Sequence, residues 1–496
     1  MSAVSRACYT DNNSGEKGGL PMTFQRGSAG VRLPAVAGAF YPGDPATLAH
    51  LIDGYLAEAV RLEPEPSILI APHAGYVYSG GVAAHSFKQA FERDYARVIV
   101  LGFNHQLSYA FDGAAVWTEG AWRTLLGDVP IDADFASVLL ATSPVFFANQ
   151  NYHLEEHSLE VEVPFIQRVL PGVPIVPISI GRPTLENVRT ISDALASVMH
   201  VHPKTLVVVS TDLSHYPRYA DATQIDHSSV QAVLSLDVLA LEAWDEEAMS
   251  SRTANLHTTM CGKGPVMVAM MLARAIGAER VRLIKYANSG DVPDGELGRV
   301  VGYAAIEFSL GEPPALSDAD KTALLKLSRD TLREYLTTKI TPKFTPTSEA
   351  MQQPRATFVT LRQARTHDLR GCRGEVFARY PLWESVQRVS ILSAVDDPRF
   401  RPMTASELPD VHLEISVLTP LRLAQSPDEV VVGKHGVMIR RGGRGGLFLP
   451  QVPVEQNWDR DEYLSTLCWM KAGLPADAWR KPDTQLYVFE AEIFEE

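Results

Sequence analysis

The segment SILIAPHAGYVYSGG, residues 67–81, decides how the N-terminal half of the chain folds. Four apolar residues run directly into Pro72, and Gly75 follows three positions later. A short apolar run that stops at proline and glycine indicates a buried strand ending in a loop. This loop presents the imidazole of His73, and ligands of open α/β sheets collect beyond the carboxyl ends of strands. His73 is therefore the first candidate for a functional site.

The composition is that of an ordinary globular protein with more than one domain. A chain of 496 residues is too long for a single core, and 46% hydrophobic with 21% charged residues is unexceptional. A net charge of −14 argues against nucleic acid as the main partner. Four scattered cysteines favour a reducing compartment, and the chain lacks an apolar run of the ~20 residues that a membrane-spanning helix needs. We expect a cytoplasmic protein with neither a membrane nor a nucleic-acid partner.

The pattern of a buried strand followed by polar residues recurs along this half of the chain. Arg97–Leu101 is an apolar run that leads to His105, and Leu206–Ser210 leads to Asp212 and His215. Further strands are expected at 174–180, 281–286 and 300–308, and helices at about 81–91, 157–170, 185–200, 225–245 and 263–276. Such alternation predicts an α/β domain with a largely parallel sheet and helices on both faces.

Polar residues at equivalent strand ends favour one shared site. A single histidine near a strand end is more often structural than functional, but recurrence at the same topological position is unlike random scatter. Cys261 opens a further helix, where the helix dipole favours a thiolate and so a nucleophile or metal ligand. A buried, inert cysteine explains Cys261 equally well.

The segment HLEEHSLE, residues 153–160, opens another predicted helix and carries two further candidates. His157 and Glu160 lie three residues apart, on one face of that helix. Glu155 and Glu156 are explained as solvated acids near the positive end of the helix.

These residue types together suit a metal. Two neutral imidazoles and one thiolate make a three-ligand site for a transition metal, with positions left open for substrate, water or dioxygen. A histidine outside the ligand set, such as His215, is then available as a general acid or base, with Asp212 to orient it or bind substrate. No Walker A loop, GxGxxG or Ser-His-Asp elbow follows a predicted strand, so phosphoryl transfer and dinucleotide binding lack support.

Several motifs, in order and in register, resemble the Memo family, whose fold is related to class III extradiol ring-cleaving dioxygenases. The motifs are APHAGYVYSG, GFNH, EHSLEVEVPF, STDLSHY and TMCGKGP, and the resemblance covers about Arg32 to Leu310. It implies iron(II) or copper as the metal, with zinc ranked behind them. By this resemblance the metal ligands are His73, His105 and Cys261; the pocket is lined by Asp212 and His215, with His157 and Glu160 beside it. Tyr76, which follows His73 by three residues, is a further candidate for the substrate side of the pocket, and packing explains it equally well.

The dioxygenases hold iron with two histidines and a carboxylate, whereas here Cys261 takes the place of the carboxylate. A thiolate is softer and is itself oxidisable, which puts simple ring cleavage in doubt. The leading hypothesis is a metal-dependent, dioxygenase-like oxidoreductase acting on an unknown small molecule. The alternatives are a non-enzymatic metal- or ligand-binding scaffold or signalling protein and, ranked last, hydrolysis assisted by zinc.

The domain boundaries follow from composition. Residues 1–30 are rich in Gly, Ser and Asn and are expected to be disordered, residues 31–310 form the first domain, and the Pro-rich residues 311–317 form a linker. Residues 318–496 are expected to form a smaller α+β domain. Its expected helices are 318–337, 383–394 and 460–471, and its expected strands include 356–361 and 411–417.

The most informative segment of this second domain is LRGCRGE, residues 369–375. Gly371 and Gly374 flank Cys372 and permit a close backbone approach, while Arg370 and Arg373 would lower the pKa of the thiol. A ligand-contact role for the motif and a tight turn holding a buried cysteine are weighed equally.

The second domain resembles the AMMECR family. LRGCRGEV, DPRFRPMTASELPDVHLEISVL, GKHGVMIR and LFLPQVPVEQNWD carry this resemblance from about Ser317 to Glu496. Fusion of the two families implies a shared pathway, and in microbes both are associated with a radical-SAM protein, which is the partner the resemblance suggests. The chain itself lacks the CxxxCxxC cluster of a radical-SAM enzyme.

Overall fold

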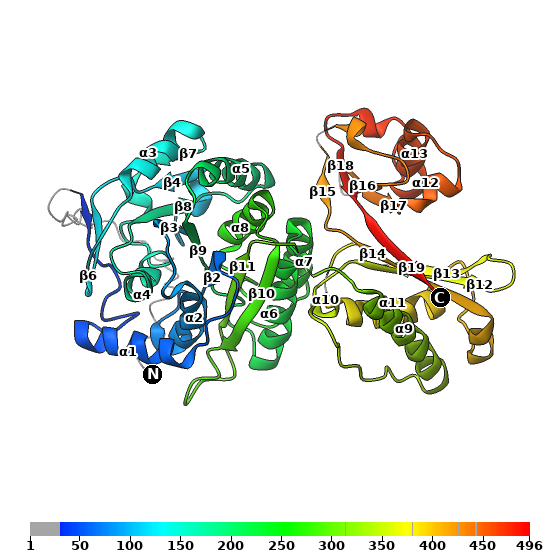
Figure 1. Cartoon of the computed structure of the whole chain (residues 1–496), viewed down its shortest axis with the longest axis horizontal. Helices are drawn as coiled ribbons and strands as arrows, with labels where there is room; N and C mark the ends of the chain where they lie inside the picture. The colour runs from blue at the N-terminus through cyan, green and yellow to red at the C-terminus, as the bar shows by residue number, and fades with distance from the viewer. Residues whose placement is uncertain (1–29, 313, 379, 425, 442–443) are drawn as a thin grey trace, which may run out of the picture. The chain divides into compact units, whose positions relative to one another are not determined.

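The computed structural model describes residues 30–312, 314–378, 380–424, 426–441 and 444–496. The chain divides into two compact units, Met1–Asp226 with Ala248–Gly311 and His227–Glu247 with Glu312–Glu496 (Figure 1). Apart from Gly30, the N-terminal segment predicted to be disordered lies outside the described residues.

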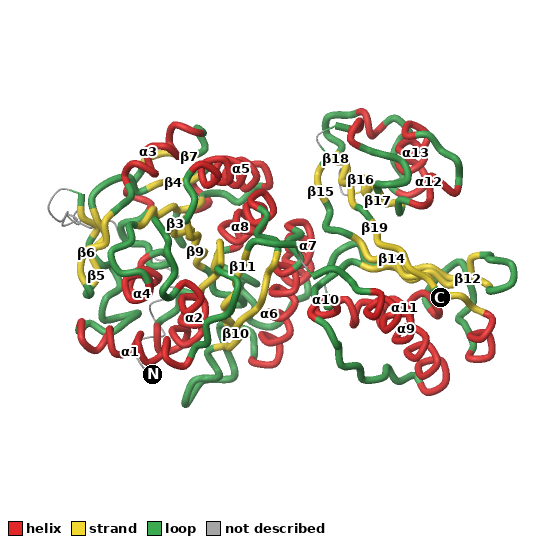
Figure 2. The backbone as a smooth tube through the Cα atoms, in the orientation of Figure 1, coloured by secondary structure: helices red, strands yellow, loops and turns green. Residues whose placement is uncertain are grey.

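The first unit is built on an eight-stranded sheet with the strand order β10-β11-β2-β9-β3-β8-β4-β7. Figure 2 distinguishes the strands, in yellow, from the helices, in red. The strands are β2 (Pro66–Ala71), β3 (Arg97–Phe103), β4 (Ala114–Val116), β7 (Phe146–Ala148), β8 (Ile175–Ile180), β9 (Thr205–Ser210), β10 (Arg280–Asn288) and β11 (Gly302–Ser309). The central strands β2, β9, β3 and β8 are parallel, and every residue of β8 and β9 is buried. Continuous apolar runs of this kind are typical of parallel strands covered on both faces. The predicted α/β class is therefore confirmed.

Antiparallel pairs flank the central parallel strands on both sides, although the edge strand β7 pairs parallel with β4. Strands β10 and β11 run antiparallel to each other, β11 runs antiparallel to β2, and β4 runs antiparallel to β8. A separate three-stranded sheet joins β1 (Val31–Arg32), β5 (Ala121–Thr124) and β6 (Gly127–Pro130). Short strands such as these have too few residues to give a clear alternating pattern, so the sequence did not predict them.

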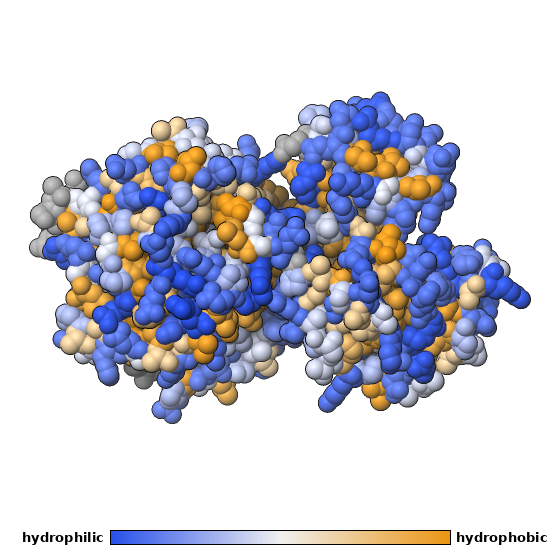
Figure 3. Space-filling view, in the orientation of Figure 1, coloured by the Kyte–Doolittle hydropathy of each residue, from blue (hydrophilic) through white to orange (hydrophobic). Residues whose placement is uncertain are grey.

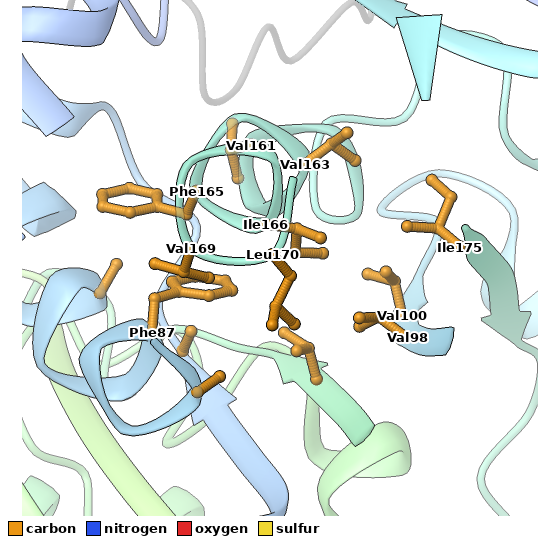
Figure 4. Close-up of a cluster of buried hydrophobic side chains, with 14 of the residues drawn as sticks. Phe87, Val98, Val100, Val161, Val163, Phe165, Ile166, Val169, Leu170 and Ile175 are labelled. Atoms are coloured by element: carbon orange, nitrogen blue, oxygen red, sulfur yellow. The ribbon is translucent and has the colours of Figure 1, made fainter. Parts of the chain in front are cut away.

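Helices surround this sheet. They are α1 (Pro45–Glu58), α2 (Tyr76–Ala90), α3 (Ala133–Thr142), α4 (Val163–Val169), α5 (Leu185–Val201) and α8 (Lys263–Ile276). Helix α6 (Tyr219–Leu234) begins in this unit, but residues His227–Glu247, which include the rest of α6 and most of α7 (Val238–Ser250), belong to the second unit. The rings of Phe87 from α2 and Phe165 from α4 stack at 5.1 Å between centroids, within the cluster of buried side chains drawn in Figure 4. The sequence predicted that helix α2 begins near Gly81, but it begins at Tyr76. Tyr76 and Tyr78, which follow β2, therefore belong to the helix.

The second unit contains two four-stranded sheets. One has the order β13-β12-β14-β19 and packs against α9 (Asp318–Thr338) and α11 (Leu382–Val395); the other has the order β15-β18-β16-β17, with α12 (Gln451–Glu455) and α13 (Arg460–Thr466). The strands are β12 (Thr357–Gln363), β13 (Leu369–Gly374), β14 (Val411–Leu418), β15 (Arg422–Leu423), β16 (Gly436–Arg441), β17 (Arg444–Phe448), β18 (Gln485–Phe489) and β19 (Ala491–Glu495). Helix α9 begins with a capping box in which Ser317 and Asp320 bond reciprocally.

The surface is largely hydrophilic on the face drawn in Figure 3, and apolar residues there occur in small groups. Among the described residues, no helix is both long enough and apolar enough to cross a membrane.

Candidate metal centre

Three neighbouring parallel strands deliver polar side chains to one edge of the sheet. His73 follows β2, His105 follows β3 and Asp212 follows β9, and β9 lies between the other two. Because the carboxyl ends of parallel strands meet at the same edge, residues far apart in sequence converge there. The ring centroids of His73 and His105 are 5.4 Å apart.

Cys261 enters from the loop that precedes α8. Its Sγ lies 3.3 Å from Nε2 of His73, and the backbone N–H of Asp212 donates to the same sulfur over 3.3 Å. The next residue is Gly262, where a Cβ atom would lie 2.6 Å from the carbonyl oxygen of Ser210. Only glycine allows the loop to approach β9 this closely, so the small residue fixes the position of the thiol.

The possible ligand atoms form two groups that share His73. The first consists of His73, His105 and His157; the second consists of His73, Asp212 and Cys261. Within each group the ligand atoms lie within 4.8 Å of one another. The trio inferred from sequence, His73 with His105 and Cys261, is not itself one of these groups, because His105 belongs to the first and Cys261 to the second. His157 stacks on His105, with ring centroids 4.3 Å apart and an interplanar angle of 14°.

Burial decides the protonation of the ligands. It lowers the pKa of His73 well below its usual value, with the nearby His105 acting in the same direction. The pKa of His157 falls to about 4 for the same two reasons. Burial also raises the pKa of the Cys261 thiol and raises that of Asp212 to about 7. The imidazoles of His73 and His157 are thus neutral at pH 7, as a metal requires, whereas the thiol must release its proton.

Glu156 holds His105 in place, contrary to the expectation that it is a solvated helix-start acid. Its carboxylate accepts from Nδ1 of His105 at 2.8 Å and from the backbone N–H of the same residue at 2.7 Å. Although burial alone would raise its pKa, the hydrogen bond from His105 brings the pKa of Glu156 down to about 2. An Nδ1–H bound to a carboxylate leaves Nε2 of His105 free, the arrangement that metal-binding histidines commonly show.

His215 lies near the ligands without joining either group. Its backbone pairs with Thr258, three residues before Cys261, and its Nε2 is buried with no hydrogen-bond partner among the described residues. Burial, with His105 as the next cause, lowers its pKa to about 3, so the ring is neutral. An unpartnered buried ring nitrogen beside a ligand cluster is a costly feature that a bound molecule would satisfy.

Glu160 and Tyr76 have other partners. Glu160 is buried and accepts from the guanidinium of Arg32 at 2.7 Å and from the hydroxyl of Tyr41 at 2.7 Å. Two backbone N–H groups, those of Ala35 and Val36, complete its bonds. The hydroxyl of Tyr76 donates to the carbonyl of Val161 at 2.6 Å, and its ring packs in the core. Both residues support the segment that carries Glu156 and His157.

The second predicted motif lies on β13 of the other unit. The backbone N–H of Cys372 donates to Asp397 at 2.8 Å, and Thr360 donates to its sulfur at 3.4 Å. Arg370 and Arg373 pair with Glu407 and Asp396 instead of the thiol. Burial raises the pKa of Cys372, and the cation that opposes this effect is Arg399. The expectation that Arg370 and Arg373 activate the thiol is therefore wrong.

The glycines of this motif serve packing. A Cβ atom on Gly371 would lie 2.2 Å from the carbonyl oxygen of Ser393, and one on Gly374 would lie 2.2 Å from the ring of Phe358. Both positions require glycine because the sheet and its neighbours pack against the bare backbone.

We expect Cys372 to react slowly with iodoacetamide at pH 7 and faster as the pH rises, by about tenfold for each pH unit below the pKa of the thiol, because only the thiolate reacts. Arg399→Ala should slow the reaction further, whereas Arg373→Ala should leave it unchanged. Peptide mass spectrometry distinguishes Cys372 from the other cysteines. Rapid alkylation at pH 7 would show that the thiol is activated after all.

Comparison with known proteins finds a matching family for two parts of the chain. Residues 32–307 match the family model described as Memo-like protein, and residues 325–494 match that of AMMECR1. A MEMO1 family protein of Methanopyrus kandleri is 36% identical over 292 residues, which are 56% of this chain and 99% of that protein. A MEMO1 family protein of Sulfurisphaera tokodaii is 35% identical over 293 residues, with the same shares covered. The crystal structure of uncharacterized protein PH0010 from Pyrococcus horikoshii matches with 42% identity over 35% of this chain and 90% of that one, with a TM-score of 0.34.

Proposed function

The chain belongs to the Memo family over residues 32–307 and carries an AMMECR1 domain over residues 325–494, and from this premise we propose that its first unit is a metal-dependent oxidoreductase. We propose iron(II) or copper as the metal and a small molecule as the substrate. The observation that carries this proposal is the convergence of buried, neutral imidazoles with a thiol and a carboxyl around His73. Donors of this mixed kind suit a transition metal better than they suit magnesium or calcium.

His73, His105 and Cys261 would hold the metal, and Asp212 would position His73. One carboxylate oxygen of Asp212 accepts from the backbone N–H of His73 at 2.9 Å, which fixes the loop that carries the imidazole. Glu156 fixes His105 in the same sense. A bound iron or copper ion would supply electron transfer and the activation of dioxygen. His105, with 30% of its side chain exposed, and His157, with 22%, border the open side from which a small molecule would enter.

His215 is the candidate proton acceptor. Its ring is neutral at pH 7, so an unprotonated ring nitrogen is available to take a proton from an acidic group of the substrate. Its pKa is depressed to about 3, firstly by burial. A bound substrate that carries negative charge would raise this pKa toward neutrality by charge attraction.

We expect His215→Gln to keep its metal but to lose turnover by at least about 100-fold, the lower range for the loss of a general base. Dioxygen consumption by anaerobically loaded protein, supplied with the small-molecule fraction of a cell extract, measures turnover. The matched control is His200→Gln, at an exposed position on α5.

Two outcomes would contradict the proposal in different ways. Undiminished dioxygen consumption by His215→Gln would remove this histidine from the mechanism. No dioxygen consumption by the loaded wild-type protein, with any such fraction, would favour the alternative of a metal-binding scaffold.

A further inference from the structure

The side chain behind His73 is a buried hydroxyl with three close neighbours. Oγ of Ser210, the last residue of β9, lies 2.7 Å from Nδ1 of His73, 2.5 Å from the carbonyl oxygen of Ser158 and 2.8 Å from Oε1 of Glu162. Ser158, Glu162 and Ser210 are each 0% exposed, and His73 is 1% exposed. Water therefore has no access to satisfy any of these atoms in place of the protein.

Counting protons fixes the direction of each bond. A serine hydroxyl has one proton to donate and two lone pairs to accept with. The carbonyl oxygen of Ser158 can only accept, and an oxygen–oxygen contact of 2.5 Å without a proton would be repulsive, so the hydroxyl proton lies there. Nδ1 of His73 and the carboxyl of Glu162 must then both donate to the hydroxyl oxygen of Ser210.

Burial supports a protonated Glu162 independently. Its pKa is raised well above the usual value, mainly by burial, and Asp212 reinforces this shift. A proton donated by Ser210 would oppose the shift, but the single hydroxyl proton is engaged with the carbonyl of Ser158. Oε2 of Glu162 is buried without a hydrogen-bond partner among the described residues, a position that would be costly for an ionised oxygen.

We infer that Ser210, supported by a neutral Glu162, is a positioning residue that holds His73 with Nδ1 protonated and Nε2 free. Nε2 is the atom that lies 3.3 Å from Sγ of Cys261, on the side where the metal would bind. The inference rests on the proposed metal centre. It adds that Ser210 and Glu162 select the tautomer of His73, the ligand that both groups share.

The two histidine ligands are thus held by different chemistry. Glu156, beside the partly exposed His105, has a pKa of about 2 and is an ionised carboxylate. Behind the fully buried His73, the hydroxyl of Ser210 accepts the hydrogen bond from Nδ1 and is supported by a protonated carboxyl. This arrangement holds the imidazole without placing a second negative charge in the interior. Because a buried unpaired charge is costly, the neutral device suits the deeper position.

The tautomer is measurable without any metal. Full-length apo-protein with ¹⁵N-labelled histidine rings gives long-range ¹H–¹⁵N correlations that separate the two tautomers, and the His73 signals are assigned by their loss in His73→Gln. We expect His73 to be the Nδ1–H tautomer in the wild type and to lose this preference in Ser210→Ala. The matched control is Ser192→Ala, at a hydroxyl that is also 0% exposed but donates to carbonyls of α5 and α8.

Metal affinity gives a second readout. Ser210→Ala should bind iron(II), titrated alone under anaerobic conditions, about 10- to 100-fold more weakly than the wild type, the usual cost of losing a partner behind a ligand. Glu162→Gln should retain the affinity and the tautomer, because the amide can still donate to Ser210. Two results would overturn the inference: an Nε2–H tautomer of His73 in the wild type, or an Nδ1–H tautomer that persists unchanged in Ser210→Ala. Failure of the wild type to bind iron would instead refute the proposed function, and the apo-protein spectrum would still decide the tautomer.

Discussion

His73→Gln is expected to remove bound metal from the protein altogether. His73 is the one residue common to both groups of possible ligands, so its loss leaves neither group complete. The loss of affinity should far exceed the about 10- to 100-fold cost of removing a partner behind a ligand, because a ligand itself is removed. Elemental analysis after anaerobic loading and desalting should find about one iron or copper per wild-type chain and almost none in the variant.

The control for this experiment is His50→Gln, which changes an exposed histidine of α1 and should leave the metal content unchanged. Equal thermal stability of the two variants would show that the loss is local. Metal retained by His73→Gln at the wild-type level would place the ion elsewhere in the chain.

Arg32→Met is expected to destabilise the first unit by about 3–5 kcal/mol, the range for breaking a buried ion pair from one side. Arg32 and Glu160 are each 1% exposed, and their side chains pair at 2.7 Å. The same guanidinium donates to the carbonyls of His153 and Glu156 and lies 4.3 Å from the ring centroid of Trp122. Without it, Glu160 is left as a buried charge and two carbonyls lose their donor.

The measurement is calorimetric unfolding of the full chain, with the transition of the first unit compared between variants. The control is Arg168→Met, which removes an arginine paired with Asp53 at side chains 39% and 48% exposed, and exposed pairs contribute about 0–1 kcal/mol. Adding Glu160→Gln to Arg32→Met should recover part of the loss, because the stranded charge is gone. An Arg32→Met variant no less stable than Arg168→Met would contradict this account of the buried pair.

Much of the site could be predicted from the sequence, because its main residues lie directly after strands that are recognisable as apolar runs. His73, His105 and Asp212 each come two residues after the end of a strand, and the sheet then brings them together. Cys261 was identifiable because small residues and an apolar helix follow it.

The residues behind the ligands could not be predicted, because their role depends on tertiary position alone. Glu155 and Glu156 are adjacent and chemically alike, yet the first is exposed and the second is buried against His105. Likewise Ser210 and Glu162 look like an ordinary strand end and an ordinary helix-start acid. The sequence around these acids does not show which side chain points into the protein, because the burial of each one depends on segments that are distant in sequence.

The second motif shows the same limit. The arginines adjacent to Cys372 in sequence have acidic partners of their own, and the cation near the thiol is Arg399, which donates to the carbonyl of Cys372 at 3.1 Å. Proximity along the chain was a poor guide there because successive residues of a strand point to opposite faces, which directs Arg373 away from the thiol, and because Glu407 pairs with Arg370.

X-ray absorption spectroscopy at the iron edge, on full-length protein loaded anaerobically with iron(II), tests the proposed centre most directly. The expected spectrum of the wild type contains imidazole scattering from His73 and His105 and one sulfur scatterer from Cys261. Cys261→Ser should lose the sulfur signal while keeping the imidazoles. A wild-type spectrum without sulfur, or one that His73→Gln leaves unchanged, would contradict a metal centre built around His73.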